Sequence, residues 1–357
     1  MRTILLNPGP VTLSERVRGA LLGPDLCHRE SEFASLQDGL RRKLLAVYAL
    51  CPTDWGATLL TGSGTAAVEA MITSMVPREG RLLVAENGVY GERISRIAEV
   101  YGIATTRVAT AWGERLDLDA IAQALRTRPH SHVAVVHHET TTGRLNDLAS
   151  LAALCREAQV AILLDGVSSF GAEQLDFTAW HIDACAATAN KCLHGVPGTA
   201  FVIVRRAALA KAQVTRSVYF DLREYLARQD GQGTPFTPSV QTFYALDAAL
   251  DEFFEAGGWA ARQALFRQRM ATVRMTLETL GVRALLSAHD TSCVLHAFEL
   301  PDDRTYQVLH DALKTRGFII YAGQGALSER LFRVSAMGDI SAADLARLCR
   351  ALQEVLS

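Results

Sequence analysis

The stretch VAILLDG, residues 160–166, is an apolar run that ends in an aspartate and a glycine. It follows an amphipathic stretch, DLASLAALCREA (147–158), which in turn follows another apolar run, HVAVVHH (132–138). Continuous apolar runs of this length are typical of strands that are covered on both faces of a parallel sheet. The order strand, helix, strand therefore favours a fold of the α/β class.

The same alternation extends outward in both directions along the chain. Three further apolar runs are ATLLT (57–61), RLLVAE (81–86) and TAFVIV (199–204), and the amphipathic stretches among these runs include TAAVEAMITSMV, ERISRIAEVYG and LDAIAQALRTR. Strands that alternate with helices in this way predict a mostly parallel, doubly wound sheet.

The pattern changes after residue 240. A long helical region covers roughly residues 240–282, and it is followed by short strands and a helix near residues 304–315. We therefore expect a large α/β domain of residues 1–240, which includes an N-terminal segment of residues 1–20, and a smaller α+β domain of residues 241–357.

Composition limits the classes of partner. The 357 residues are 49% hydrophobic, and 36 Lys and Arg stand against 38 Asp and Glu, so a basic surface for nucleic acid or acidic membranes is not expected. The seven cysteines contain no C-x-x-C pair, which disfavours a disulfide framework and a structural zinc site. The N-terminus MRTILLNPGP meets two prolines and a glycine too early for a secretory or membrane segment. We expect a cytoplasmic protein that binds a small metabolite.

A glycine-rich turn, Gly62-Ser63-Gly64-Thr65, separates an expected strand from an expected helix. Its backbone N–H groups and hydroxyls would face an anion at the positive end of the helix, so a phosphate fits there. The same letters also match the G-x-G-x-x-A dinucleotide fingerprint, and Glu86 ends the next strand, where an acid could bind a ribose. On this stretch alone, a nicotinamide site stays open.

Asp165 and Lys191 are the second pair of candidates. Asp165 ends the strand of residues 160–166, at the edge of the sheet where ligands of α/β proteins bind. Lys191 follows after one more short strand. An amine and a buried carboxylate suit pyridoxal phosphate, because its aldehyde needs an amine and its protonated pyridine nitrogen needs an anion. A nicotinamide enzyme requires neither group.

The doublet His137-His138 beside Glu139 is a weaker candidate, for a metal site. Adjacent side chains of a strand point to opposite faces of the sheet, so the two imidazoles would not bind one ion together. We therefore expect no metal site here.

Several segments together carry a resemblance to a known family. These are the glycine-rich turn, HHETTTG, LLDGVSSFGA, TANKCLHGVPG and the late FRVSAMG. In this order they resemble the class V, fold-type I pyridoxal-phosphate aminotransferases, from NPGP near the N-terminus to FRVSAMG. The resemblance implies pyridoxal 5′-phosphate as cofactor, and a homodimer whose active sites are shared between subunits.

The resemblance also implies a role for individual residues. Lys191 would be the Schiff-base lysine and Asp165 the partner of the pyridine nitrogen, while Tyr90 would stack on the ring and Thr140 would approach the ring oxygen. Thr237 would complete the phosphate site of the other subunit. The residues assigned to the cofactor are Ser63, Gly64, Thr65, Tyr90, Thr140, Asp165, Val167, Asn190, Lys191 and Thr237.

Arg333 in LFRVSAMG matches the family arginine that holds the acidic group of the substrate. Within the family the chain is most similar to enzymes that transfer the amino group of 2-aminoethylphosphonate to pyruvate, and we expect these substrates. An alanine or serine–glyoxylate aminotransferase and a lyase on a related amino substrate are the alternatives. Ser335 departs from the family pattern, because relatives that use aminoethylphosphonate tend to have glycine there.

Overall fold

The computed structural model describes residues 2–357 of the protein. Seven strands form the central sheet of its larger part. Their order across the sheet is β2 (Trp55–Gly62), β10 (Gly198–Arg205), β9 (Ile182–Thr188), β8 (Ala161–Asp165), β5 (His132–Val136), β3 (Arg81–Glu86) and β4 (Ala104–Ala109). Only β10 runs antiparallel to its neighbours. The predicted α/β fold with a mostly parallel sheet is confirmed.

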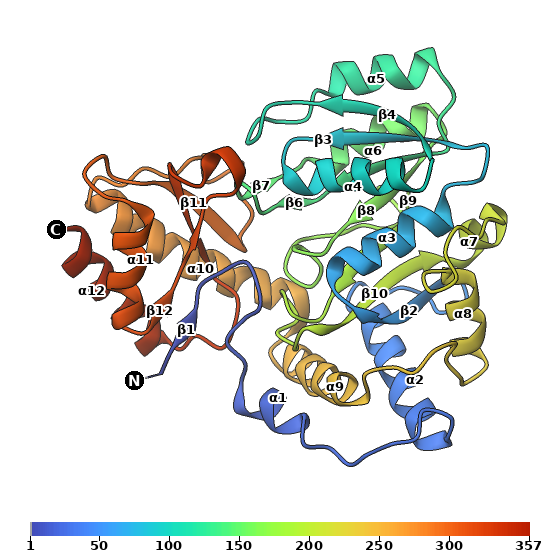
Figure 1. The fold of residues 1–357 in the computed structure, drawn as a ribbon, viewed down its shortest axis with the longest axis horizontal. Helices are drawn as coiled ribbons and strands as arrows, with labels where there is room; N and C mark the ends of the chain where they lie inside the picture. Colours follow the sequence, from blue (N-terminus) through green and yellow to red (C-terminus); the bar gives the residue numbers. More distant parts are fainter. Residues whose placement is uncertain (1) are drawn as a thin grey trace.

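Helices cover both faces of this sheet (Figure 1). Ile162 and Leu164 of β8 pack into one apolar core, whereas Leu163 packs into the core on the opposite face. This alternation explains why the strand reads as a continuous apolar run. One face carries α2 (Ser31–Ala46), α5 (Leu118–Thr127), α6 (Leu148–Glu157) and α9 (Val240–Glu255), and the other carries α3 (Gly64–Met75), α4 (Val89–Val100), α7 (Arg206–Ala212) and α8 (Leu222–Asp230).

The strand β4 was not predicted from the sequence. It pairs only with β3 and lies at the edge of the sheet, so its side chains are partly or fully exposed. An edge strand has a neighbouring strand on one side only and is less buried, and the sequence ATTRVA consequently shows no continuous apolar run.

The smaller part of the protein contains a three-stranded antiparallel sheet packed against helices. Its core includes the buried rings of Phe266, Phe298, Phe318 and Phe332. The strands are β11 (Leu295–Glu299), β14 (Leu331–Ser335) and β13 (Tyr321–Ala322), and the helices are α10 (Gly258–Thr279), α11 (Tyr306–Thr315) and α12 (Ala342–Leu356). A parallel pair, β1 (Ile4–Leu5) and β12 (Phe318–Ile319), joins the N-terminus to this part.

Two segments differ from the expected division at residue 240. The expected helical region of residues 240–282 is two helices, of which α9 packs against the large sheet through side chains such as Phe243. The N-terminal residues Ile4 and Leu6 instead belong to the core of the smaller part. Figure 1 shows α10 running between the two parts of the protein. The remaining short elements are α1 (Glu15–Ala20), β6 (His138–Glu139), β7 (Arg144–Leu145) and a 3₁₀ turn at Gly325–Leu327.

None of the helices within residues 2–357 combines the length and the apolar character needed to cross a lipid bilayer.

Candidate active site

Asp165 lies at the carboxyl end of β8, beside the last residues of β5 and next to β9. Its side chain is buried, and its Oδ1 accepts a hydrogen bond of 2.9 Å from the backbone N–H of Val167. Burial raises the pKa of Asp165 to about 6, and the positive charges of Lys191 and Arg93 oppose that shift. The carboxylate is therefore placed where a cation would stabilise its ionised form.

Lys191 follows β9 and directs its amine into the same region. Its Nζ donates a hydrogen bond to the backbone carbonyl of Pro8. Burial lowers the pKa of Lys191 to about 8; the charges of Arg333 and Arg93 act in the same direction, and the Asp165 carboxylate acts in the opposite sense. A lysine whose pKa is lowered in this way is neutral more often than a surface lysine, as a nucleophilic amine requires.

The N-terminal turn over Lys191 was missed in the sequence analysis. Gly9 has a φ of 114°, and a Cβ atom added there would lie 2.9 Å from Cδ of Lys191. The turn follows β1 and continues the pairing with the smaller part, since Ser335 donates its N–H to the carbonyl of Leu6 at 2.8 Å. The signal in the sequence was the Pro-Gly-Pro run itself, which places a glycine between two rigid residues.

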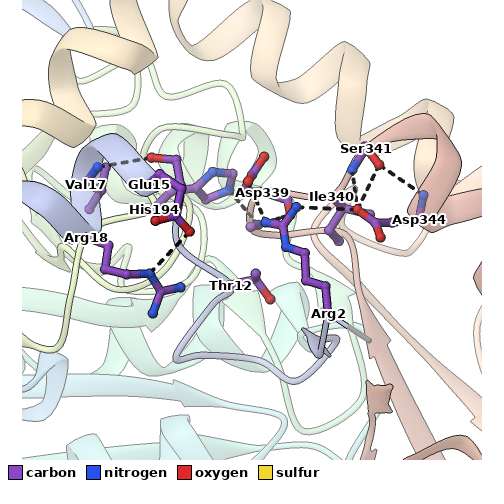
Figure 2. Close-up of polar contacts among 12 residues, drawn as sticks. Arg2, Thr12, Glu15, Val17, Arg18, His194, Asp339, Ile340, Ser341 and Asp344 are labelled. Atoms are coloured by element: carbon purple, nitrogen blue, oxygen red, sulfur yellow. Dashed lines mark hydrogen bonds and ion pairs between the residues drawn. The ribbon is translucent and has the colours of Figure 1, made fainter. Parts of the chain in front are cut away.

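Figure 2 shows polar contacts that hold the first residues of the chain, among them Arg2 and Thr12, against the segment around Asp339. Arg2 forms an ion pair of 2.5 Å with Asp339, whose N–H donates to the carbonyl of Thr12 at 2.8 Å. On the loop that carries Lys191 (residues 189–197, the lysine loop), Nε2 of His194 accepts a hydrogen bond of 2.8 Å from the N–H of Gly338. The N-terminal segment and the lysine loop are thus both bonded to the loop that follows β14.

The glycine-rich turn begins α3 and contacts the segment after Asp165. A Cβ atom on Gly64 would lie 2.7 Å from Cγ1 of Val167, so only glycine allows this approach. Ser63 occupies the N-cap position of α3, and its side chain makes no capping hydrogen bond. The Thr65 hydroxyl accepts a hydrogen bond of 3.1 Å from Nη1 of Arg93. The structure thus brings Gly64 of the turn close to Val167, which is also predicted to bind the cofactor.

Tyr90 lies at the start of α4, and Glu139 anchors the turn that carries it. Oε2 of Glu139 accepts hydrogen bonds from the N–H groups of Tyr90 at 3.2 Å and Gly91 at 3.3 Å. Oε1 of the same carboxylate accepts from the Thr141 hydroxyl at 2.6 Å. Burial raises the pKa of Glu139 to about 7. Sequence reasoning assigned no role to Glu139, because its contacts link segments that lie far apart in the chain.

Thr140 and Arg333 meet between the two parts of the protein. Nη1 of Arg333 donates to the carbonyl of Thr140 at 2.8 Å, and Nε donates to the carbonyl of Ala322 at 2.8 Å. The Thr140 hydroxyl is buried, and no described residue forms a hydrogen bond with it. Because a buried hydroxyl without a partner is costly, this atom fits a ligand oxygen such as the ring oxygen of pyridoxal phosphate.

Two of the residues predicted to bind the cofactor, Asn190 and Thr237, have contacts that relate to the site only indirectly. Asn190 precedes Lys191, and its Oδ1 accepts a hydrogen bond of 2.8 Å from the Thr188 hydroxyl, so the amide orients the lysine loop. Thr237 lies in the loop between α8 and α9 with an exposed side chain. Its proposed role concerns another subunit and stays a prediction.

The residues behind the nicotinamide and metal interpretations, Glu86 and the doublet His137-His138, have other partners in the structure. The Glu86 carboxylate is buried and forms two hydrogen bonds of 2.8 Å with Arg107 on β4, so it serves to pair that arginine rather than to face a ribose. Nδ1 of His138 contacts the carbonyl of Ser168 at 3.0 Å, whereas the ring of His137 meets the ring of Trp180 edge-on. The two imidazoles therefore have different neighbours. Within residues 2–357, no three His, Cys, Asp or Glu side chains are grouped as a metal site.

The sequence model of the family described as aminotransferase class-V matches residues 29–348. The chain belongs to the class-V aminotransferases. Its relatives include the 2-aminoethylphosphonate–pyruvate transaminases of Klebsiella pneumoniae and Vibrio cholerae, each 36% identical over 99% of this chain and 97% of the relative. Membership of the family implies pyridoxal phosphate as the cofactor.

Solved structures of other aminotransferases have the same fold. An aspartate aminotransferase from Thermus thermophilus is 29% identical, with a TM-score of 0.90 over 99% of both chains. An alanine–glyoxylate aminotransferase from Nostoc is 26% identical, with a TM-score of 0.92 over 100% of this chain and 96% of the other. The fold-type I architecture expected for this class-V aminotransferase is thereby confirmed.

Proposed function

We propose that this class-V aminotransferase transfers the amino group of 2-aminoethylphosphonate to pyruvate, giving phosphonoacetaldehyde and L-alanine. The observation that carries the proposal is the similarity to 2-aminoethylphosphonate–pyruvate transaminases, which extends over 99% of the chain at 35–36% identity. The site supports the proposal because it combines a lysine of lowered pKa, a buried carboxylate and a buried arginine.

The residues of the site fit pyridoxal phosphate, as the unpartnered Thr140 hydroxyl and the uncapped start of α3 indicate. When bound, the cofactor supplies an electron sink for the carbon that loses the amino group. Lys191 would hold the cofactor through its aldehyde group, and its Nζ would carry a proton to and from the substrate carbon. Asp165 would hold the pyridine nitrogen protonated through its ionised carboxylate.

Further residues would orient the cofactor. Ser63, Gly64 and Thr65 would hold the phosphate at the N-terminus of α3, where N–H groups face outward. Tyr90 would fix the plane of the ring from the start of α4, and Thr140 would donate to its oxygen.

Arg333 would bind the acidic group of each substrate in turn. Its Nε and Nη1 already donate to the backbone carbonyls of Ala322 and Thr140, which fixes the plane of the guanidinium. No described residue accepts a hydrogen bond of standard geometry from its Nη2, so that nitrogen is available to an acid. A guanidinium binds carboxylates and phosphonates equally well in geometry, as alternating substrates require.

We also propose a homodimer in which Thr237 of one subunit contacts the phosphate in the other. The exposed Thr237 has large apolar neighbours, because Phe236 stacks on the ring of Tyr219 with centres 4.9 Å apart. Val218 is 81% exposed and the adjacent Tyr219 is 38% exposed, so the surface beside this loop offers apolar area that a second subunit would cover. Sedimentation of the purified protein tests the assembly, and a monomer at micromolar concentration would contradict it.

The test of the function uses the purified protein and a set of amino donors. We expect alanine to form from pyruvate with 2-aminoethylphosphonate as donor, together with an equal amount of phosphonoacetaldehyde. The principal alternative, an alanine–glyoxylate-type reaction, is favoured by the structural similarity to the Nostoc enzyme. Glyoxylate as the better acceptor, with alanine or serine as donor, would establish that alternative. Release of ammonia or phosphate without a 2-oxo acid would instead establish a lyase.

A further inference from the structure

Arg93 lies between two groups that the proposed site assigns to opposite parts of the cofactor. It is on α4, three residues after Tyr90, and its guanidinium carbon lies 4.7 Å from the centre of the Tyr90 ring. Its Nη1 donates a hydrogen bond of 3.1 Å to the hydroxyl of Thr65. One side chain therefore contacts both the turn proposed for the phosphate and the ring proposed to stack on the pyridine.

The direction of the hydrogen bond to Thr65 is fixed by chemistry. A guanidinium can only donate, so the Thr65 oxygen must act as the acceptor. The single proton of this hydroxyl is then not used by Arg93 and can be donated to another acceptor. Thr65 lies in the first turn of α3, where the helix dipole favours an anion. The contact with Arg93 therefore makes Thr65 a donor at a position where a phosphate oxygen would accept.

The contact with Tyr90 restrains the ring. Residues three positions apart on a helix are neighbours, and a planar guanidinium packs well on the face of an aromatic ring. The Tyr90 backbone is held separately by the Glu139 carboxylate at 3.2 Å. The backbone and the side chain of Tyr90 thus have independent supports, and Arg93 supplies the second.

We propose that Arg93 is a positioning residue for the cofactor, which holds the Thr65 hydroxyl as a donor to the phosphate and braces the ring of Tyr90. This inference depends on the proposed function only for the identity of the cofactor. The positive charge of Arg93 also acts on the lysine and the aspartate, since it favours ionised Asp165 and neutral Lys191.

The test compares pyridoxal phosphate with pyridoxal, which lacks the phosphate, as ligands of the full-length protein freed of cofactor. Loss of one charge-assisted hydrogen bond predicts that Arg93→Gln weakens binding of pyridoxal phosphate about tenfold. Binding of pyridoxal to the same variant should change less than about threefold, which also shows that the site is still folded. Arg96→Gln is the matched control, because Arg96 lies on the same helix, is exposed and pairs only with Glu99 among the charged groups that the structure describes.

A double-mutant cycle with Thr65→Val tests whether Arg93 acts through the hydroxyl. If it does, Arg93→Gln costs less than about threefold in the Thr65→Val background, because the donor is already absent. An equal loss in both backgrounds, or an equal loss for pyridoxal and pyridoxal phosphate, would overturn the action through Thr65, and no loss at all for pyridoxal would overturn the brace on Tyr90. Failure of the wild-type protein to bind pyridoxal phosphate would overturn the proposed function and the inference together.

Discussion

The guanidinium of Arg333 donates a hydrogen bond of 2.8 Å to the backbone carbonyl of Thr140, which lies 193 residues earlier in the chain. Arg333 is on β14 of the smaller part, and Thr140 directly follows β6, in the segment after β5 of the large sheet. One contact therefore links the residue proposed to bind the substrate acid to the loop proposed to bind the cofactor oxygen.

We predict that Arg333→Lys lowers kcat/KM about 100-fold for both the amino donor and the 2-oxo acid, since charged hydrogen bonds contribute about 1.5–3 kcal/mol each. An ammonium is a point charge and cannot bond two backbone carbonyls and an acid in one plane. Steady-state kinetics with each substrate varied in turn measures the effect. Arg330→Lys is the control, because Arg330 is exposed. A loss confined to one of the two substrates would contradict a shared role for Arg333.

We predict that Lys191→Ala abolishes turnover and the covalent attachment of pyridoxal phosphate, because the other lysines within residues 2–357 lie on α2, α7 and α11. Borohydride reduction followed by peptide mass spectrometry should find the cofactor on Lys191 in the wild-type protein and on no peptide in the variant. Lys211→Ala on α7 is the control, since that side chain is exposed. Multiple turnovers by the Lys191 variant would refute the central assignment.

A strand or a turn could be predicted from the sequence where the residues of a single segment are enough to identify it. The buried strand of Asp165 is an uninterrupted apolar run because both faces of the sheet are covered, and the glycine-rich turn is recognisable because only glycine fits beside Val167. The edge strand β4 has no such signal, because its side chains are partly in water. For the same reason, the exposed Arg107 gave no indication that it pairs with Glu86.

Contacts between distant segments could not be predicted. The carbonyl of Pro8 that accepts from Lys191 belongs to the backbone, so no side chain type marks it. Glu139 was considered only with its histidine neighbours, because its bonds to the start of α4 depend on how the parallel strands align. Residue types can reveal a cofactor site, but the supports around it become visible only in the fold.

We predict that the Lys191 amine in the cofactor-free protein reacts with amine reagents with a midpoint near pH 8, because burial lowers the pKa of this lysine to about 8 from 10.5. Lys43 should react only at higher pH, because its hydrogen bonds to Asp247 and Asp251 raise its pKa although burial opposes them. Asp165→Asn should lower the midpoint further, since the carboxylate favours the ammonium form. Labelling rates measured by mass spectrometry provide the test, and a midpoint near 10.5 would contradict the prediction.

We predict that Glu139→Gln makes the stability of the cofactor-free protein less dependent on pH between about 4.5 and 7. Burial raises the pKa of Glu139 from 4.5 to about 7, so in this range the folded state retains a proton that the unfolded state has lost. The wild-type protein consequently loses stability from this group as the pH rises, on the order of 3 kcal/mol across the window. Urea unfolding of both proteins at several pH values measures the difference. A constant difference in the free energy of unfolding would contradict the assignment.

We predict that Gly9→Ala destabilises the protein and slows the reaction of the Lys191 amine, whereas Gly19→Ala does neither. At Gly9 the φ of 114° is unfavourable for alanine, and its Cβ would lie 2.9 Å from Cδ of Lys191, so the lysine or the turn must move. Each strain of this kind costs about 1–3 kcal/mol. Gly19 is in α1 with no atom within 4 Å of the added Cβ, so alanine there should stabilise the helix slightly. Urea unfolding and amine labelling of both variants separate the two effects. Unchanged labelling of Lys191 in Gly9→Ala would show that the N-terminal turn does not position the amine.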